Sequence, residues 1–346
     1  MSSRGKKKDL KHGHGYLLDA WLPPADAGEL IGCVATSFTF QPAFFVEECL
    51  GRCLGMTSDA EDDGLAHLIE LEEKLAQARC LALVDQAHAH GTHTLRWDLL
   101  SARVPGGILH AKVSVLVWAA HVRVIVASAN LTEPGYRSNR EIFGVLNYYE
   151  GGTAPLSVLH ELLSFLAQTA RQCVEPSSAR ERWADVLKLA RIKAQSWGSE
   201  QPGMVRAVLS GLGQADTLTQ LSKDVWPLKR PPTFARVGSP FFDLNPGDNA
   251  PARRLWELLD QRIAEVQWEV AGRIESAKPP VVYLKLPGTI RNAQPTGSSQ
   301  TFFVSWQTTM KVRNRANFMQ SGCGWKMRIW RFISSARPIS PVRAWG

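Results

Sequence analysis

Hydrophobic residues along the chain follow two periodicities, one typical of strands and the other of helices. Runs that are β-branched or alternate between apolar and polar residues predict strands at Ala35–Phe40, Cys80–Asp85, Lys112–Trp118, Val122–Ser128, Met204–Leu209 and Val281–Leu286. Apolar residues spaced three and four apart predict helices at Pro42–Leu54, Gly64–Cys80, Pro155–Cys173, Ala179–Trp197 and Pro251–Val270. Because strands and helices interleave, we expect an α/β fold with a layered sheet flanked by helices.

Cysteine usage and the N-terminal residues bear on the compartment. The six cysteines are scattered, and the only close pair, Cys49 and Cys53, has helical spacing rather than that of a zinc or redox site. We therefore expect buried free thiols in a reducing compartment. The basic start has no apolar stretch of the kind found in a signal sequence, and no run approaches the roughly 18 apolar residues of a membrane span. These features predict a cytoplasmic protein without a transmembrane segment.

Four polar residues mark the ends of two neighbouring predicted strands. His110 and Lys112 precede the first apolar run, and Ser128 and Asn130 follow the second. If Ala119, Ala120 and His121 form the turn of a hairpin, His110 lies opposite Asn130 and Lys112 opposite Ser128. Opposed side chains have Cβ atoms about 4.5 to 5.5 Å apart, so the four polar groups would surround one oxyanion.

This combination of side chains suits a phosphodiester. Histidine is a competent nucleophile near neutral pH, lysine supplies positive charge to phosphate oxygens, and asparagine and serine add directional hydrogen bonds. No metal or other cofactor is expected. The alternative is purely structural: His110 caps a strand end, Lys112 extends to solvent and Ser128–Thr132 is a turn.

The same residues resemble the signature of the phospholipase D superfamily, which is His-x-Lys, an apolar strand, then Gly/Ser-Ser-x-Asn. The matching stretches are "HAK" at His110–Lys112 and "ASAN" at Ala127–Asn130, and "SNRE" at Ser138–Glu141 is similar to the acidic end of the motif. Upstream, "TSFTFQPAFFVEECL" at Thr36–Leu50 resembles the opening strand and helix of bacterial members and of tyrosyl-DNA phosphodiesterases. Many members carry Asp where this chain has Val117, which the tyrosyl-DNA phosphodiesterase branch also lacks.

The resemblance implies a role for each matching residue. His110 would attack phosphorus and form a phosphohistidine, while Lys112, Asn130 and Ser128 bind the substrate and stabilise negative charge. Glu141 would orient His110. A second histidine, from a second motif or from a partner in a homodimer, would protonate the leaving oxygen. The substrate class, DNA, RNA or lipid, is left open.

The net charge of +8 has an unusual distribution. Gly297–Gly346 contains eight Lys or Arg and no Asp or Glu, so the rest of the chain is balanced. A reading-frame error explains this segment: when the third base of each codon is read with the first two of the next, Phe318–Ser321 permits His-Ala-Lys. In that frame Pro338–Gly346 permits an Asn at the same separation from the hidden His as Asn130 has from His110. The alternative is a natural basic tail, exposed or RNA-binding.

Four segments follow from these observations. We expect a disordered basic tail over residues 1–15, a phospholipase D-like catalytic half over 16–225, a partial second half over 226–296 and a frameshifted basic tail over 297–346. The proline-rich Trp226–Phe234 is the candidate boundary between the halves. The expected function is phosphodiester hydrolysis, impaired by loss of the second motif; the alternative is a non-catalytic remnant that binds phosphate or nucleic acid. The histidines of "HAHGTH", His88, His90 and His93, match no established metal-ligand spacing and are expected in a surface loop.

Overall fold

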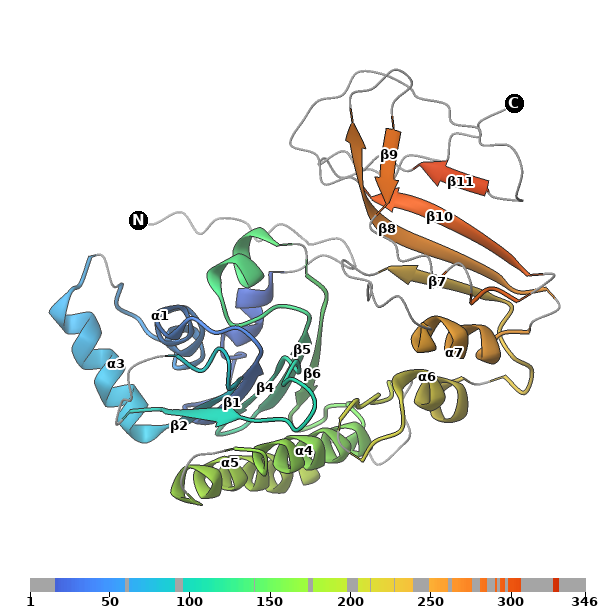
Figure 1. The fold of residues 1–346 in the computed structure, drawn as a ribbon. Coiled ribbons are helices and arrows are strands. Elements are labelled where there is room, and N and C mark those ends of the chain that lie inside the picture. Colours follow the sequence, from blue (N-terminus) through green and yellow to red (C-terminus); the bar gives the residue numbers. More distant parts are fainter. Residues whose placement is uncertain are drawn as a thin grey trace. The chain divides into compact units, whose positions relative to one another are not determined.

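A computed structural model of the chain describes residues 16–59, 62–90, 96–139, 141–173, 177–197, 205–211, 213–226, 228–238, 249–260, 263–275, 281–284, 290, 293–295, 298–305 and 326–329. The chain divides into two compact units, Met1–Leu209 and Ser210–Gly346. Figure 1 shows both units coloured along the sequence. In the part of the chain that is described, no helix is long and apolar enough to cross a membrane.

The first unit is built on a six-stranded sheet in the order β3-β2-β1-β4-β5-β6. Its strands are β1 (Leu30–Ser37), β2 (Arg79–Asp85), β3 (Asp98–Ala102), β4 (Val113–Trp118), β5 (Val122–Ala127) and β6 (Phe143–Tyr148). The first three strands pair in parallel, and β4, β5 and β6 continue the sheet in antiparallel pairs. The α/β fold expected from the sequence is thus confirmed.

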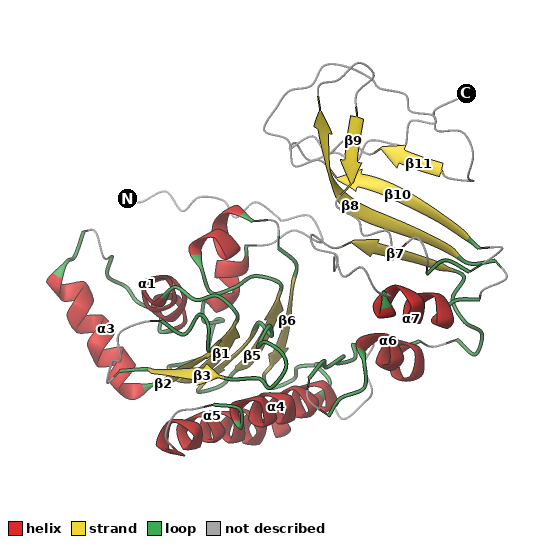
Figure 2. Ribbon diagram, viewed as in Figure 1, coloured by secondary structure: helices red, strands yellow, loops and turns green. Residues whose placement is uncertain are grey.

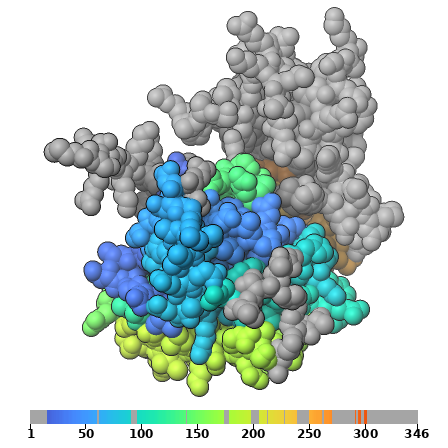
Figure 3. All heavy atoms as spheres, turned by 90° about the vertical axis from the view of Figure 1, so that its left-hand side faces the viewer, coloured from blue at the N-terminus to red at the C-terminus, as the bar shows by residue number. Residues whose placement is uncertain are grey.

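Helices cover both faces of this sheet, as the strands and helices of Figure 2 show. On one face lie η1 (Leu17–Trp21), α1 (Pro42–Phe44), η2 (Phe45–Leu50), α2 (Gly51–Cys53) and α3 (Leu65–Gln77), and on the other α4 (Leu156–Ala170) and α5 (Ser177–Gln195). In the space-filling view α3 lies on the surface in light blue and the α4 and α5 layer in yellow-green below it (Figure 3). Alternate residues of β4 enter the two cores: Leu116 and Trp118 on the first face, Val115 and Val117 on the second. Burial on both faces explains why this strand is apolar almost throughout.

The hairpin between β4 and β5 is shifted by one residue from the expected register. Val117 pairs with Val122, and the backbone N–H of Ala127 donates to the carbonyl of Lys112 at 3.0 Å, so Lys112 lies opposite Ala127 rather than Ser128. The expected pairing of His110 with Asn130 is therefore wrong. The cause is a turn of two residues instead of three.

Contacts with a distant segment determine the length of that turn. The N–H groups of Ala119 and Ala120 donate to the carbonyls of Glu29 and Ala27 at 3.0 and 2.8 Å. Gly28, at φ +73°, lies so close that a Cβ there would be 2.8 Å from the Cβ of Ala119. The register cannot be predicted from the two strands alone, because these contacts involve a distant segment. An error of one residue in the register moves every side chain of a strand to the other face of the sheet.

Several other expected boundaries change. The predicted helix Pro251–Val270 is wrong beyond its first part, because α7 (Ala250–Leu258) ends and β8 (Glu265–Glu275) follows. Buried Ala264, Val266 and Trp268 alternate with half-buried residues there, which is the period of a strand. The predicted strand Met204–Leu209 is not formed over its described part, residues 205–209. Strands β3 and β6 were not predicted.

The second unit contains α6 (Thr217–Gln220), η4 (Leu221–Val225), α7 and a five-stranded sheet. Its strands are β7 (Phe234–Gly238), β8, β9 (Val281–Leu284), β10 (Ser299–Ser305) and β11 (Lys326–Ile329). The parallel order β10-β8-β7, with α7 between β7 and β8 in the chain, matches β3-β2-β1, with α3 between β1 and β2. Within the described residues, the second unit thus repeats the topology with which the first unit begins.

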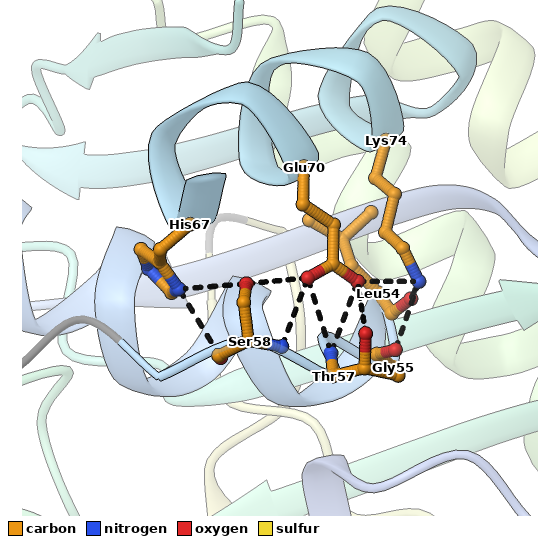
Figure 4. A network of polar contacts seen from close by, with 7 residues as sticks. All are labelled: Leu54, Gly55, Thr57, Ser58, His67, Glu70 and Lys74. Carbon is orange, nitrogen blue, oxygen red and sulfur yellow. Dashed lines mark hydrogen bonds and ion pairs between the residues drawn. The ribbon is translucent and has the colours of Figure 1, made fainter. Parts of the chain in front are cut away.

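The carboxylate of Glu70 on α3 fixes the loop that enters this helix (Figure 4). It accepts the backbone N–H groups of Thr57 and Ser58 at 3.0 and 2.9 Å and the hydroxyl groups of both residues. Hydrogen bonds from Ser58 and Thr57 lower the pKa of Glu70 to about 2. Lys74 lies 3.4 Å from the carboxylate and donates to two carbonyls at the end of α2.

We predict that Glu70→Gln lowers the free energy of unfolding by on the order of 1 kcal/mol at pH 7, a modest value because solvent screens this site. The folded pKa lies below the ordinary value of 4.5, so the carboxylate stabilises the fold above pH 4.5 and this contribution is lost as the pH falls toward about 2. Urea unfolding at both ends of this range measures the difference. Glu73→Gln, an exposed change on the same helix, is the control; equal effects of the two changes would contradict the prediction.

Candidate active site

The candidate site lies at the edge of the first sheet where β1, β2 and β5 end and β4 begins. These strand ends are joined side by side: the N–H of Val113 donates to the hydroxyl of Thr36 at 2.9 Å, and the hydroxyl of Thr36 lies 3.4 Å from the carbonyl of Val113. Residues distant in sequence are brought to one edge in this way, and an edge of this kind is where α/β sheets carry their sites.

His110 and Lys112 are in direct contact just before β4. The Nζ atom of Lys112 lies 3.1 Å from Nδ1 and 3.4 Å from Nε2 of His110, and it donates to the His110 carbonyl at 3.0 Å. The imidazole is exposed, whereas Lys112 is only 8% exposed. The side chain of His110 is thus exposed to solvent, and the ammonium group of the buried Lys112 contacts its ring.

The surroundings lower the pKa of both groups. Burial lowers the pKa of Lys112 to about 8, against the opposing effect of the negative charge of Glu141. Burial and the charge of Lys112 lower the pKa of His110 below 6.5, against the effect of Asp85. At pH 7 the imidazole is therefore mostly neutral and the lysine mostly charged, which is the combination that a nucleophile and an anion-binding group require.

Asn130 is held by the end of β1. Its Oδ1 accepts the backbone N–H groups of Phe38 and Thr39 at 3.2 and 3.3 Å and lies 3.4 Å from the hydroxyl oxygen of Ser37. Backbone N–H groups only donate, so the atom facing them is the oxygen and the amide nitrogen points away. That nitrogen donates to none of the described residues, and it is available to an anionic ligand.

Ser128 and Glu141 form a separate pair next to Lys112. The Ser128 hydroxyl donates to Glu141, and it accepts the backbone N–H of Ile142 at 2.9 Å. The other carboxylate oxygen of Glu141 accepts from Asn139 at 3.2 Å. Glu141 makes no hydrogen bond with His110 here, and its charge acts instead on Lys112.

Two residues of the site were missed in the sequence. The buried carboxylate of Asp85, at the end of β2, accepts the N–H of Leu109 at 2.7 Å and that of Ala87 at 3.0 Å. The Phe38 ring lies 5.0 Å from the imidazole of His110, centroid to centroid. An acidic residue that ends an apolar strand was a usable signal for Asp85, and Phe38 lies in the stretch Thr36–Leu50 that resembles the opening strand and helix of the family.

The structure describes only some of the other residues that the sequence singled out as possible metal ligands or as parts of the terminal tails. His88 and His90 are described, His93 is not, and no group of three metal-ligating side chains occurs among the described residues. Residues 1–15 and the stretch Phe318–Ser321, where the alternative frame permits His-Ala-Lys, lie outside the described residues, as does Pro338–Gly346.

Comparisons with known proteins give distant structural likeness only. No model of a known protein family matches the chain, and no curated protein matches it significantly in sequence. Among solved structures, one mutant of yeast tyrosyl-DNA phosphodiesterase is similar at a TM-score of 0.31 with 9% identity, over 48% of this chain and 36% of that one. A second mutant of the same yeast enzyme gives 0.29 and 10%, over 46% and 34%. The chain thus matches about a third of the length of those proteins, and likeness at this level does not establish a family.

We predict that Lys112→Met raises the pKa of His110, because the substitution removes the neighbouring positive charge and keeps much of the burial. Titration of the imidazole by NMR measures the shift directly and requires no activity. Lys74→Met, which removes a lysine from the distant Glu70 network, should leave the His110 titration unchanged. An unchanged pKa in Lys112→Met would mean that the two side chains are not in contact in solution.

Proposed function

We propose that the chain is a phosphodiesterase of the phospholipase D type that acts through a phosphohistidine at His110. The observation that carries the proposal is the contact between an exposed imidazole of lowered pKa and a buried lysine ammonium. A neutral imidazole is a competent nucleophile, and an ammonium partly removed from water interacts strongly with an anionic phosphoryl group. DNA, RNA and phospholipid all contain the required bond.

The proposed reaction has two displacements at phosphorus. A ring nitrogen of His110 attacks phosphorus, and a P–N bond forms as the P–O bond to the leaving group breaks; the leaving oxygen takes up a proton. Lys112 and the amide of Asn130 stabilise the negative charge on the non-bridging oxygens. Water then attacks phosphorus, the P–N bond breaks, and a phosphomonoester and free His110 are released.

We predict that His110→Asn abolishes hydrolysis of bis(p-nitrophenyl) phosphate and that Lys112→Ala lowers kcat/KM by about 100-fold or more, because a charge that stabilises the transition state is lost. Release of p-nitrophenol measures both effects, and circular dichroism checks the fold of each variant. Normal turnover in His110→Asn contradicts the proposal. Binding of a phosphodiester without any turnover by the unmodified chain would favour the alternative, a non-catalytic remnant.

We further propose that the second unit is a partial second half whose motif was lost by a frameshift. Its β7 corresponds in topology to β1, and β1 has β4, the strand that follows His110 and Lys112, as its other neighbour. No described strand occupies the corresponding side of β7. The permitted His-Ala-Lys at Phe318–Ser321 follows β10 in the chain, as His110–Lys112 follows β3.

We predict that restoring the alternative frame upstream of Trp306 gives a chain that continues past Gly346 and hydrolyses phosphodiesters at least about 100-fold faster, because it regains a second acid–base histidine. Resequencing the gene and comparing the two proteins tests this. An error-free gene together with an equally active original chain would contradict the frameshift. A homodimer that shares two copies of His110 is the other route to activity, and sedimentation of the active species detects it.

Cysteine chemistry supports a reducing, cytoplasmic location for the protein. All five cysteines in the described part of the chain are free and buried, and burial raises the pKa of Cys33, Cys49, Cys53 and Cys80. Thiols of this kind stay protonated and pack as small apolar side chains.

A further inference from the structure

Phosphodiester cleavage by His110 needs a source of the proton for the leaving oxygen, and one histidine among the described residues of the first unit lies near His110. His88 lies in the turn after β2, and its ring contacts the same Phe38 ring as His110 does. The centroids of His88 and His110 lie 4.5 and 5.0 Å from the centroid of Phe38. The two imidazoles are therefore no farther apart than these two distances placed end to end.

An upper limit of this size permits a single phosphoryl group between the two rings. Attack requires a nitrogen about 3 to 3.5 Å from phosphorus, and an acid must lie within about 3 Å of the leaving oxygen. Because the acid approaches the leaving oxygen at an angle to the line of attack, the two ring nitrogens would be about 7 Å apart, a separation that the upper limit on the centroid distance permits.

The backbone at both histidines is fixed by one buried carboxylate. Asp85 accepts the N–H of Leu109, next to His110, and the N–H of Ala87, next to His88. Its carbonyl also accepts the N–H of His88 at 2.8 Å. The carboxylate thus fixes the backbone beside both histidines, and both imidazoles contact the ring of Phe38.

None of the other described histidines has a ring contact with Phe38. His67 is buried against Ser58, and His121 bonds Asn147 and stacks on Tyr149. His160 belongs to α4, on the opposite face of the sheet. His90 is exposed two residues beyond His88 and makes no ring contact with a described residue.

We propose that His88 is the general acid of the first displacement and the general base of the second in this chain. As a cation it transfers a proton to the leaving oxygen while the P–O bond breaks; as a neutral ring it then removes a proton from the water that cleaves the P–N bond. The proposal rests on the proposed function. It would supply acid–base catalysis in a chain whose sequence has no histidine after His160.

The dependence of rate on the leaving group tests this role. Leaving phenols of low pKa depart without a proton, and those of high pKa need one. We expect His88→Asn to change kcat/KM by less than about threefold for a p-nitrophenyl methyl diester and to lower it about 100-fold or more for a phenyl methyl diester. The retained cleavage of the activated ester shows that the variant is folded. His90→Asn should match the unmodified chain with both esters.

The outcomes separate the two proposals. If His110→Asn is inactive and His88→Asn shows the same leaving-group dependence as the unmodified chain, phosphodiester cleavage stands and the role of His88 is wrong. A loss of the same size with both esters also overturns the acid role, because it indicates a structural defect. If the unmodified chain cleaves neither ester, or His110→Asn cleaves both, the proposed function and the role of His88 fail together.

Discussion

The chemistry of the site depends on one constraint, the burial of the Lys112 ammonium against an exposed imidazole. Lys112, directly before β4, is only 8% exposed, so its ammonium group loses much of its hydration and its pKa falls to about 8. Burial, together with the same charge, lowers the pKa of His110. An anionic ligand would relieve both costs at once, because it would replace the lost water around the ammonium.

Contacts from the ends of two strands, β1 and β2, support that arrangement. Asp85 fixes the segment before His110, the hydroxyl of Thr36 holds the start of β4, and the end of β1 orients the amide of Asn130. Each of these bonds joins residues that are far apart in the chain. The polar side chains of the site therefore depend on the formed sheet for their positions, and no local segment would assemble them alone.

The sequence predicted the layered α/β fold and the strands around the motif because their hydrophobic patterns are strong. The prediction from the sequence was wrong where contacts between residues distant in the chain determine the local structure. The turn after Trp118 has two residues because Ala27 and Glu29 accept its N–H groups, and this shifted the register by one. The short, partly polar strand Asp98–Ala102 has too weak a pattern to be recognised, although it pairs with β2 over its full length. The end of β1 holds Asn130, and Glu141 contacts Ser128 and Asn139, whereas the resemblance implied that it would orient His110.

The central claim is that phosphorus becomes bonded to His110 during turnover. Phosphohistidine survives alkali, so a reaction with excess bis(p-nitrophenyl) phosphate is stopped in base, digested and analysed by tandem mass spectrometry. We predict an adduct on the peptide that contains His110, with the mass of one p-nitrophenyl phosphoryl group and with its fragments assigned to that ring. Turnover with the adduct on another residue, or with no adduct at any time point and none in single-turnover experiments, would contradict the account.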